Sequence, residues 1–169
     1  MNAGHRVTVI GLGNVVCSDD GLGVHAVRRL RAAHRLPPGV EFIEGGTAGL
    51  LLLPHLADAD EAVLVDAVDV GAVPGTLVRL EGRELDLAAA GGTTVHDVGL
   101  VDLLRAARFS GTMPRRLVLH GAQAGSTAIG TTLSPPVFGA LDRLVARLTA
   151  ELHAWTPPPG PHADANPTR

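Results

Sequence analysis

Short runs of branched apolar residues alternate along this chain with segments whose apolar residues recur at helical spacing. We predict strands at residues 7–10, 40–43, 62–65, 75–80 and 117–120. Helices are predicted at residues 21–34, 50–56, 97–109 and 135–153. This alternation is typical of a mostly parallel sheet with helices on both faces, so we expect a three-layer α/β/α sandwich.

One link along the chain is too short to contain a crossover helix. The segment Ala67–Gly75, AVDVGAVPG, leads from the third predicted strand into the fourth. Because parallel neighbours need a crossover of about a dozen residues or more, we predict a hairpin here and one antiparallel strand. The 169 residues fit one domain. We expect a single α/β domain over residues 1–153 and a Pro-rich flexible tail over residues 154–169.

The composition argues against several classes of function. Cys17 is the only cysteine, so an intrachain disulfide and an all-cysteine zinc site are both excluded, and metal ligands must be oxygen or imidazole. The net charge of −3 and the aromatic content of 2% are unlike those of nucleic-acid-binding proteins. The chain has no lysine, which excludes a P-loop lysine and a Schiff-base lysine.

No stretch of the sequence has the pattern of a membrane or targeting segment. A membrane helix needs about 20 consecutive apolar residues, and no run approaches that length. The N-terminal MNAGHR precedes a short strand that breaks at Gly11, which is unlike the apolar centre of a signal peptide. We therefore expect no membrane partner and a cytoplasmic location.

Three polar residues lie where the predicted fold brings strand ends and helix starts together. Asp20 follows the first strand in GLGNVVCSDDGLG, Asp66 follows the third strand, and His96 precedes the helix at 97–109. Ligands of open α/β sheets bind beyond the carboxyl ends of the strands, and the first and third strands are normally neighbours. Two carboxylates and one imidazole meeting there can form a divalent-metal site.

Each of these residues also has a structural alternative. Asp19 or Asp20 would serve equally as a cap of the following helix, and Asp66 as the start of a turn. An isolated histidine is more often a surface or a hydrogen-bonded structural residue than a ligand. The coincidence of all three at one edge of the sheet is what favours the metal site.

The first loop also invites comparison with dinucleotide-binding folds. Gly11 and Gly13 match the first two glycines of G-x-G-x-x-G, but Val16 stands at the third position. Glu44 ends the second predicted strand, farther along than the acid that binds ribose in such folds. Two aspartates would also repel a pyrophosphate. We expect the glycines to allow a tight turn and a close approach of backbone.

A second glycine-rich stretch, EGGTAG, follows the second predicted strand. Exposed backbone at such an edge suits the capture of an extended peptide, although a loop that simply has to bend explains it equally well. Support for a nucleophile is thin, because no G-x-S-x-G elbow occurs. We expect Cys17 to be a small apolar filler. His120, at the end of the fifth predicted strand, is a weaker candidate, either for support of a site residue or for contact with substrate.

Four segments together resemble the nickel-iron hydrogenase maturation endopeptidases, over about Val7 to Leu152. They are GLGNVVCSDDGLGVHAVRRL, EGGTAG, LVDAV and HDVGLVDLLRAARFSGTMPRRLVLHG, in that order and spacing. The resemblance implies a five-stranded sheet between helices. It also implies a peptidase that removes the C-terminal extension of the large-subunit precursor of a nickel-iron hydrogenase, after nickel has been inserted.

The resemblance also assigns roles to residues. It implies that catalysis and metal contact belong to Asp20, Asp66 and His96. It implies that the peptide cleft is shaped by Gly45, Gly46, Thr47 and Gly49. Glu44 stands where the family usually has aspartate, which changes local geometry and keeps the charge. Nickel would then be presented by the substrate, whose thiolates hold it, while other divalent metals could bind in vitro.

Several functional alternatives remain open from the sequence. The metal could polarise the scissile carbonyl or activate water, or a carboxylate could act as the base. A non-catalytic nickel-binding assembly chaperone could use the same fold and ligands. A nucleotide-binding oxidoreductase is the third alternative.

Overall fold

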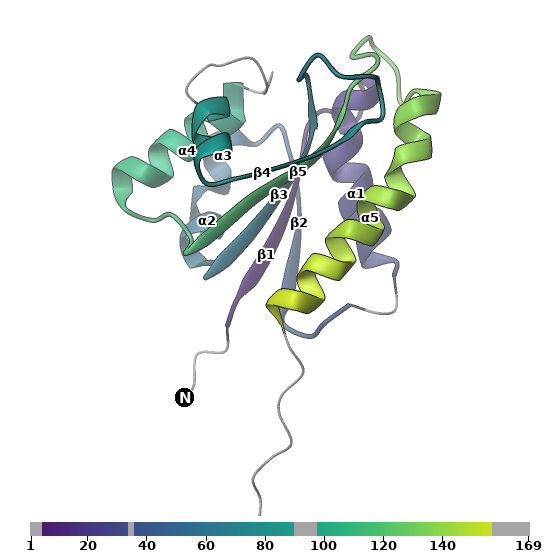
Figure 1. The fold of residues 1–169 in the computed structure, drawn as a ribbon. Coiled ribbons are helices and arrows are strands. Elements are labelled where there is room, and N and C mark those ends of the chain that lie inside the picture. Colours follow the sequence, from purple (N-terminus) through teal and green to yellow (C-terminus); the bar gives the residue numbers. More distant parts are fainter. Residues whose placement is uncertain (1–4, 34–35, 90–97, 157–169) are drawn as a thin grey trace, which may run out of the picture.

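The computed structural model describes residues 5–33, 36–89 and 98–156, with the side chains of residues 88, 89 and 98 left aside. Five strands form one sheet in the order β2-β1-β3-β5-β4 (Figure 1). Their bounds are β1 (Val7–Leu12), β2 (Val40–Gly46), β3 (Glu61–Val68), β4 (Leu77–Glu81) and β5 (Arg116–Gln123). All neighbours pair in parallel except β4, which is antiparallel to β5. This agrees with the predicted mostly parallel sheet.

Helices cover both faces of the sheet, which makes the three-layer sandwich (Figure 1). One face carries α1 (Leu22–Arg31) and α5 (Pro135–Trp155), and the other carries α2 (Leu53–Asp58), α3 (Arg83–Ala89) and α4 (Val98–Ser110). Two short 3₁₀ turns, η1 (Ser18–Gly21) and η2 (Gly49–Leu52), precede α1 and α2. Across the described ranges, no helix has the length and apolar character needed to cross a membrane.

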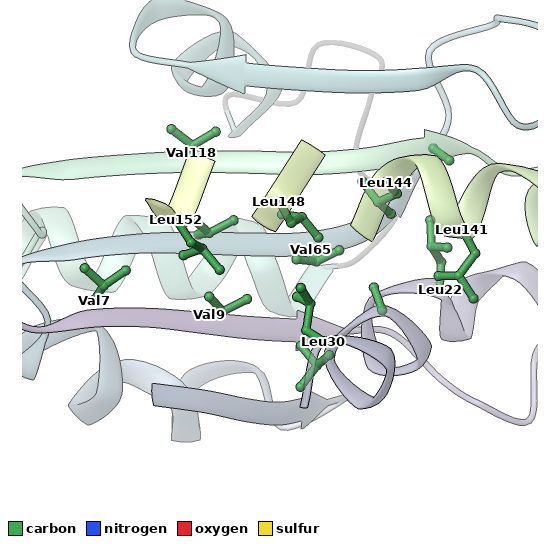
Figure 2. Close-up of a cluster of buried hydrophobic side chains, with 14 of the residues drawn as sticks. Val7, Val9, Leu22, Leu30, Val65, Val118, Leu141, Leu144, Leu148 and Leu152 are labelled. Atoms are coloured by element: carbon green, nitrogen blue, oxygen red, sulfur yellow. The ribbon is translucent and has the colours of Figure 1, made fainter. Parts of the chain in front are cut away.

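The strand side chains divide between two hydrophobic cores. Val63 and Val65 of β3 lie in the core beneath α1 and α5, whereas Ala62 and Leu64 lie in the core beneath α2 and α4. Figure 2 shows the first core, in which leucines of α5 lie over valines of the central strands. Because successive strand residues point to opposite faces, a strand buried on both sides must be apolar throughout. The middle of β3, AVLV, meets this requirement.

The predicted hairpin between the third and fourth strands is wrong. The strand β4 is antiparallel as expected, but it pairs with β5, and β5 lies between β3 and β4. Gln123 at the end of β5 holds the connection in this path, because its Oε1 accepts hydrogen bonds from the backbone N–H groups of Val70 and Ala72. The parallel strand β5, which comes later in the chain, thus occupies the position beside β3 that β4 would have taken in a hairpin.

Two further differences concern helices. The helix α3, at Arg83–Ala89, was not predicted. The helix α5 runs to Trp155, two residues past the predicted end of the domain at residue 153. Trp155 is buried, and the Arg116 guanidinium lies 4.5 Å from the centre of its ring. The remainder of the predicted tail, residues 157–169, lies outside the described residues.

Two glycines allow the α1 backbone to lie against the sheet. A Cβ placed on Gly23 would stand 2.0 Å from the carbonyl oxygen of Val65 and 2.5 Å from the backbone nitrogen of Leu12. A Cβ on Gly11 would stand 2.2 Å from the carbonyl oxygen of Gly23. These atoms belong to backbone and cannot move aside. The predicted close approach of backbone at Gly11 is therefore confirmed, and its partner is the first turn of α1.

We predict that Gly23→Ala destabilises the protein, because the added methyl group has no space between α1 and the sheet. The expected loss is about 3 kcal/mol or more in the free energy of unfolding, measured by urea denaturation. Gly139→Ala is the matched control, since Gly139 lies in α5 with open space where its Cβ would be. That change should stabilise by about 0.5–1 kcal/mol. Equal effects of the two substitutions would contradict the packing argument.

Candidate functional site

The carboxyl ends of the four parallel strands meet at one edge of the sheet, which we call the carboxyl edge. The loops that follow β1, β3 and β5 lie at this edge, together with the start of α5 (Figure 1). In folds of this class the loops at the carboxyl edge form the binding site. Two of the three predicted metal-contacting residues, Asp20 and Asp66, lie on segments at this edge.

Asp20 is fixed by the loop that follows β1. Its Oδ2 accepts a hydrogen bond of 2.7 Å from the backbone N–H of Asn14. Its backbone carbonyl lies against Gly13, where a Cβ would stand only 1.6 Å from that oxygen. Gly13 also has φ of +98°, which glycine adopts readily. The glycine at this position therefore permits both the turn and the position of Asp20.

Asp66 approaches the same turn from β3. A Cβ on Gly13 would stand 3.5 Å from Oδ1 of Asp66, so both aspartates border the Gly13 turn. Oδ1 of Asp66 accepts a hydrogen bond of 2.8 Å from the backbone N–H of Ala67. Only 1% of the Asp66 surface is exposed. By strand alternation Asp66 points to the face that α4 covers, since Leu64 and Val68 lie in the core beneath α4.

The third predicted ligand, His96, lies outside the described residues. The helix α4 begins two residues later, at Val98, and a Cβ on Gly49 would stand 3.5 Å from the Cα of Gly99. The start of α4 therefore lies beside η2. Among the side chains that the structure describes, no group of three His, Cys, Asp or Glu residues is arranged to hold a metal ion. The predicted three-ligand site therefore remains a prediction.

Asp19 has a different role from its neighbour Asp20. It is fully buried, and its carboxylate accepts hydrogen bonds from the backbone N–H groups of Gly125, Ser126 and Ser134 and from the Ser134 hydroxyl, at 2.6–2.9 Å. Burial by itself raises the pKa of Asp19, but the hydrogen bonds from Ser134, Ser126 and Gly125 outweigh it and hold the pKa below its ordinary value. Asp19 thus ties η1 to the loop before α5.

A pocket of about 410 Å³ opens beside Asp20 at the carboxyl edge. It is lined by Cys17, Asp20, Asp69 and residues 123–127. Cys17 is a free thiol and is partly exposed, so the prediction that it is a buried apolar filler is wrong. Cys17 is partly exposed because its backbone pairs with that of Gly130 in an isolated β-bridge, which holds it along the surface. Gln123, which the sequence did not suggest, donates from Nε2 to Oδ1 of Asp69 at 3.1 Å.

The glycine-rich stretch after β2 combines packing and surface positions. Gly45 is buried, and its Cβ would stand 2.8 Å from Ile10 and 3.0 Å from Leu52, so the close packing requires glycine. Gly46 and Thr47 line a second pocket, of about 220 Å³. Gly46 and Gly49 each have φ of +52°. The predicted role in peptide binding stays a prediction, and the pocket at Gly46 and Thr47 is where a peptide could bind.

Glu44 borders the same pocket and is held by two arginines of α1. Its carboxylate accepts hydrogen bonds of 2.9 Å from Nε of Arg28 and 2.8 Å from Arg31. The side chain is one-third exposed. Glu44 is therefore engaged in an ion-pair network at the outer edge of β2.

His120 does not lie at the site. The strand β5 continues three residues past it to Gln123, and His120 points into the layer beneath α5, where its Nε2 pairs with Glu151. Burial lowers the pKa of His120, and the hydrogen bond to the Glu151 carboxylate opposes that effect. Glu151 in turn accepts from Arg79 at 2.7 Å. The sequence-based suggestion that His120 contacts substrate is wrong, because β5 is longer than its apolar run.

We predict that Asp19→Asn lowers stability at neutral pH, because an amide would turn donor atoms toward backbone N–H groups. The expected loss is on the order of 2–3 kcal/mol in the free energy of unfolding. The depressed pKa means that this contribution is present above the ordinary carboxyl pKa and is lost as the pH falls through the folded value. The difference between wild type and variant, measured by urea denaturation, should therefore shrink below about pH 4.

Asp58→Asn is the control for this measurement, since Asp58 is exposed at the end of α2. It should change stability by less than about 0.5 kcal/mol. If the stability difference between wild type and Asp19→Asn stayed constant as the pH fell below about 4, the charge of Asp19 would not be what stabilises the loop.

Comparison with known proteins identifies the family of this chain. Residues 24–151 match the family model for HycI, hydrogenase maturation protease. The hydrogenase expression/formation protein HupD of Rhodobacter capsulatus is 40% identical over 154 residues, which are 89% of this chain and 72% of HupD. The hydrogenase 2 maturation protease of Escherichia coli K12 is 34% identical over 148 residues, which are 87% of this chain and 90% of that protein.

Solved structures agree with the family model. The hydrogenase maturating endopeptidase HybD from E. coli matches with a TM-score of 0.81 and 32% identity, over 89% of this chain and 93% of HybD. The chain therefore belongs to the hydrogenase maturation proteases and has the fold of an endopeptidase of that family.

Proposed function

We propose that this protease cleaves the C-terminal extension from the large-subunit precursor of a nickel-iron hydrogenase, in the cytoplasm. In this proposal Asp20, Asp66 and His96 contact nickel that the precursor carries. Nickel is part of the substrate, so the protease tests whether the metal has been inserted before it cleaves. The observation that supports this proposal is the meeting of Asp20 and Asp66 at the Gly13 turn.

The positions of the two carboxylates suit contact with a metal ion presented from outside. Asp20 lines a pocket that opens at the surface, whereas Asp66 lies beneath it at the end of β3. Oxygen ligands from the protease can occupy open coordination positions of an ion that substrate thiolates already hold. Such a ligand set engages nickel without removing it from the precursor.

The position of α4 supports the inclusion of His96. Asp66 points to the face of the sheet that α4 covers, and α4 begins two residues after His96. An imidazole there would complete a set of two oxygens and one nitrogen. Hydrolysis then adds one water molecule across the scissile peptide bond, and the proton accepted from that water passes to the leaving amine.

The pocket at Gly46 and Thr47 supports a role for the glycine-rich stretch in holding the peptide. Gly45 and Gly46 end β2, an edge strand of the sheet, and Thr47 and Gly49 follow it. An extended peptide bound along such an edge makes main-chain hydrogen bonds, which depend little on the peptide's sequence. The peptide would run from this pocket toward Asp20 across the Gly13 turn, since Gly13 and Gly46 are joined by a backbone hydrogen bond of 3.0 Å.

We predict that Asp20→Asn, Asp66→Asn and His96→Ala each slow cleavage of the nickel-loaded precursor by about 100-fold or more. The physical reason is the loss of a ligand or proton-transfer group at the reacting centre. Cleavage is measured as the loss of mass of the precursor, with the nickel-free precursor as the uncleaved reference. Asp58→Asn is a matched control at the far end of α2 and should cleave at the wild-type rate.

Thermal unfolding of the same variants separates function from folding. Each of the three site variants should unfold within a few degrees of wild type. Wild-type protein that binds the nickel-loaded precursor and leaves its mass unchanged would overturn the proposal in favour of a non-catalytic nickel-binding chaperone. Equal cleavage of nickel-loaded and nickel-free precursor would remove the metal from the recognition step.

A further inference from the structure

Six of the large apolar side chains that are exposed in the described part of the chain lie at the carboxyl edge. We call them the apolar rim, and they are Val16, Leu50, Leu51, Val73, Ile129 and Phe138. They come from the loops after β1, β2, β3 and β5 and from the first turn of α5. Exposed apolar side chains that gather on one face commonly mark a binding surface. Val16 is next to Cys17 and Ile129 follows residues 123–127, so these two rim residues border segments that line the pocket of Asp20.

Backbone hydrogen bonds hold the members of the apolar rim in place. The carbonyl of Val16 accepts from the N–H of Gly130 at 3.0 Å, which places Val16 beside Ile129. On the other side of the pocket, a Cβ on Gly75 would stand 2.5 Å from the carbonyl oxygen of Pro136, so the loop with Val73 packs on the start of α5. Preorganised loops lose little conformational freedom on binding, which favours affinity.

The pocket beside the apolar rim is acidic. It is lined by Asp20 and Asp69, and among the described residues no arginine or histidine lines it. Asp19 is fully buried, so it does not contribute to this surface. Two arginines reach the border, where Arg28 pairs with Glu44 and Arg143 donates to the carbonyl oxygen of Gly75 at 3.4 Å. The surface thus has an apolar border and an acidic centre.

We infer that the apolar rim is the docking surface for the folded body of the precursor, separate from the cleft that holds the cleaved peptide. The partner is a protein surface that is apolar around a positively charged centre, and this inference rests on the proposed function for the identity of that partner. Charge complementarity argues for it, because the acidic centre favours a cation while the apolar border favours desolvated contact. Gly46 and Thr47, which line that cleft, precede the rim residues Leu50 and Leu51 in the chain.

The test compares apolar residues at opposite edges of the sheet. The double variant Ile129→Ser with Phe138→Ser removes two rim side chains that are 94% and 67% exposed. The control is Phe109→Ser, since Phe109 is 97% exposed at the end of α4, at the opposite edge where β5 begins. The probe is the purified nickel-free large-subunit precursor from the same organism, with binding measured by calorimetry. All variants should keep the thermal midpoint of wild type.

We predict that the double variant binds the nickel-free precursor at least 10-fold more weakly, whereas Phe109→Ser stays within twofold of wild type. With nickel-loaded precursor, the double variant should show a KM about 10-fold higher and an unchanged kcat, because docking is lost and the reacting groups are intact. Wild-type affinity of the double variant would overturn the inference, as would an equal loss in Phe109→Ser or no binding of the precursor by wild type. A wild type that binds through the rim but leaves nickel-loaded precursor intact contradicts the proposed function and leaves the docking surface in place.

Discussion

The contact between the backbone of α1 and the backbones of β1 and β3 determines where the site forms. Gly11 and Gly23 permit it, because any side chain at either position would meet backbone oxygen within 2.2 Å. With α1 held there, its first turn begins at the carboxyl edge and η1 projects over the end of β3. Asp20 is then two residues from the start of the helix and next to the turn that Asp66 borders. Gly11, the first glycine of the stretch that partly matches a phosphate-binding turn, therefore serves close packing, and the carbonyl oxygen of Asp20 lies against Gly13, the second.

Adjacent aspartates in η1 show how position decides the role of a carboxylate. Asp19 points inward, where four hydrogen bonds to one loop compensate for its burial. Asp20 lines a pocket, and its Oδ2 accepts a hydrogen bond from the backbone N–H of Asn14. An inward carboxylate that is fully satisfied stabilises the loop, whereas an outward one keeps lone pairs for a ligand. The loop that Asp19 holds carries Ile129, so the structural acid also supports the surface around the functional one.

Local sequence patterns predicted most of the strands and helices, because the apolar period of each segment reflects the layer against which it packs. Asp66 was predicted to follow the third strand, but it lies within β3, two residues before the end at Val68, because the strand is longer than its apolar run. An acid so near the end of a doubly buried strand still lies close to the carboxyl edge. The partner of β4 was not predictable, because it depends on Gln123, more than fifty residues away from the N–H groups that it binds. The role of Asp19 depends on donors over a hundred residues later. Whether Asp19 caps a helix or anchors a loop therefore depends on tertiary contacts. Nothing in the local sequence around the serine and glycine donors indicates that they bind Asp19.

The charge pattern of the carboxyl edge connects the metal contact with protein recognition. Asp20 and Asp66 border one turn, and Asp20 and Asp69 line the pocket beside it. Among the described residues, no arginine or histidine lines this pocket. In the proposed function a cation brought by the partner meets carboxylate oxygens there, so binding is strongest when the partner carries its metal. The apolar rim contributes affinity that does not depend on charge. The acidic centre contributes the difference in affinity between the nickel-loaded and the nickel-free partner. A surface built from these two parts can bind a precursor first and distinguish its metal content afterwards, because discrimination requires only the difference in affinity between the two forms.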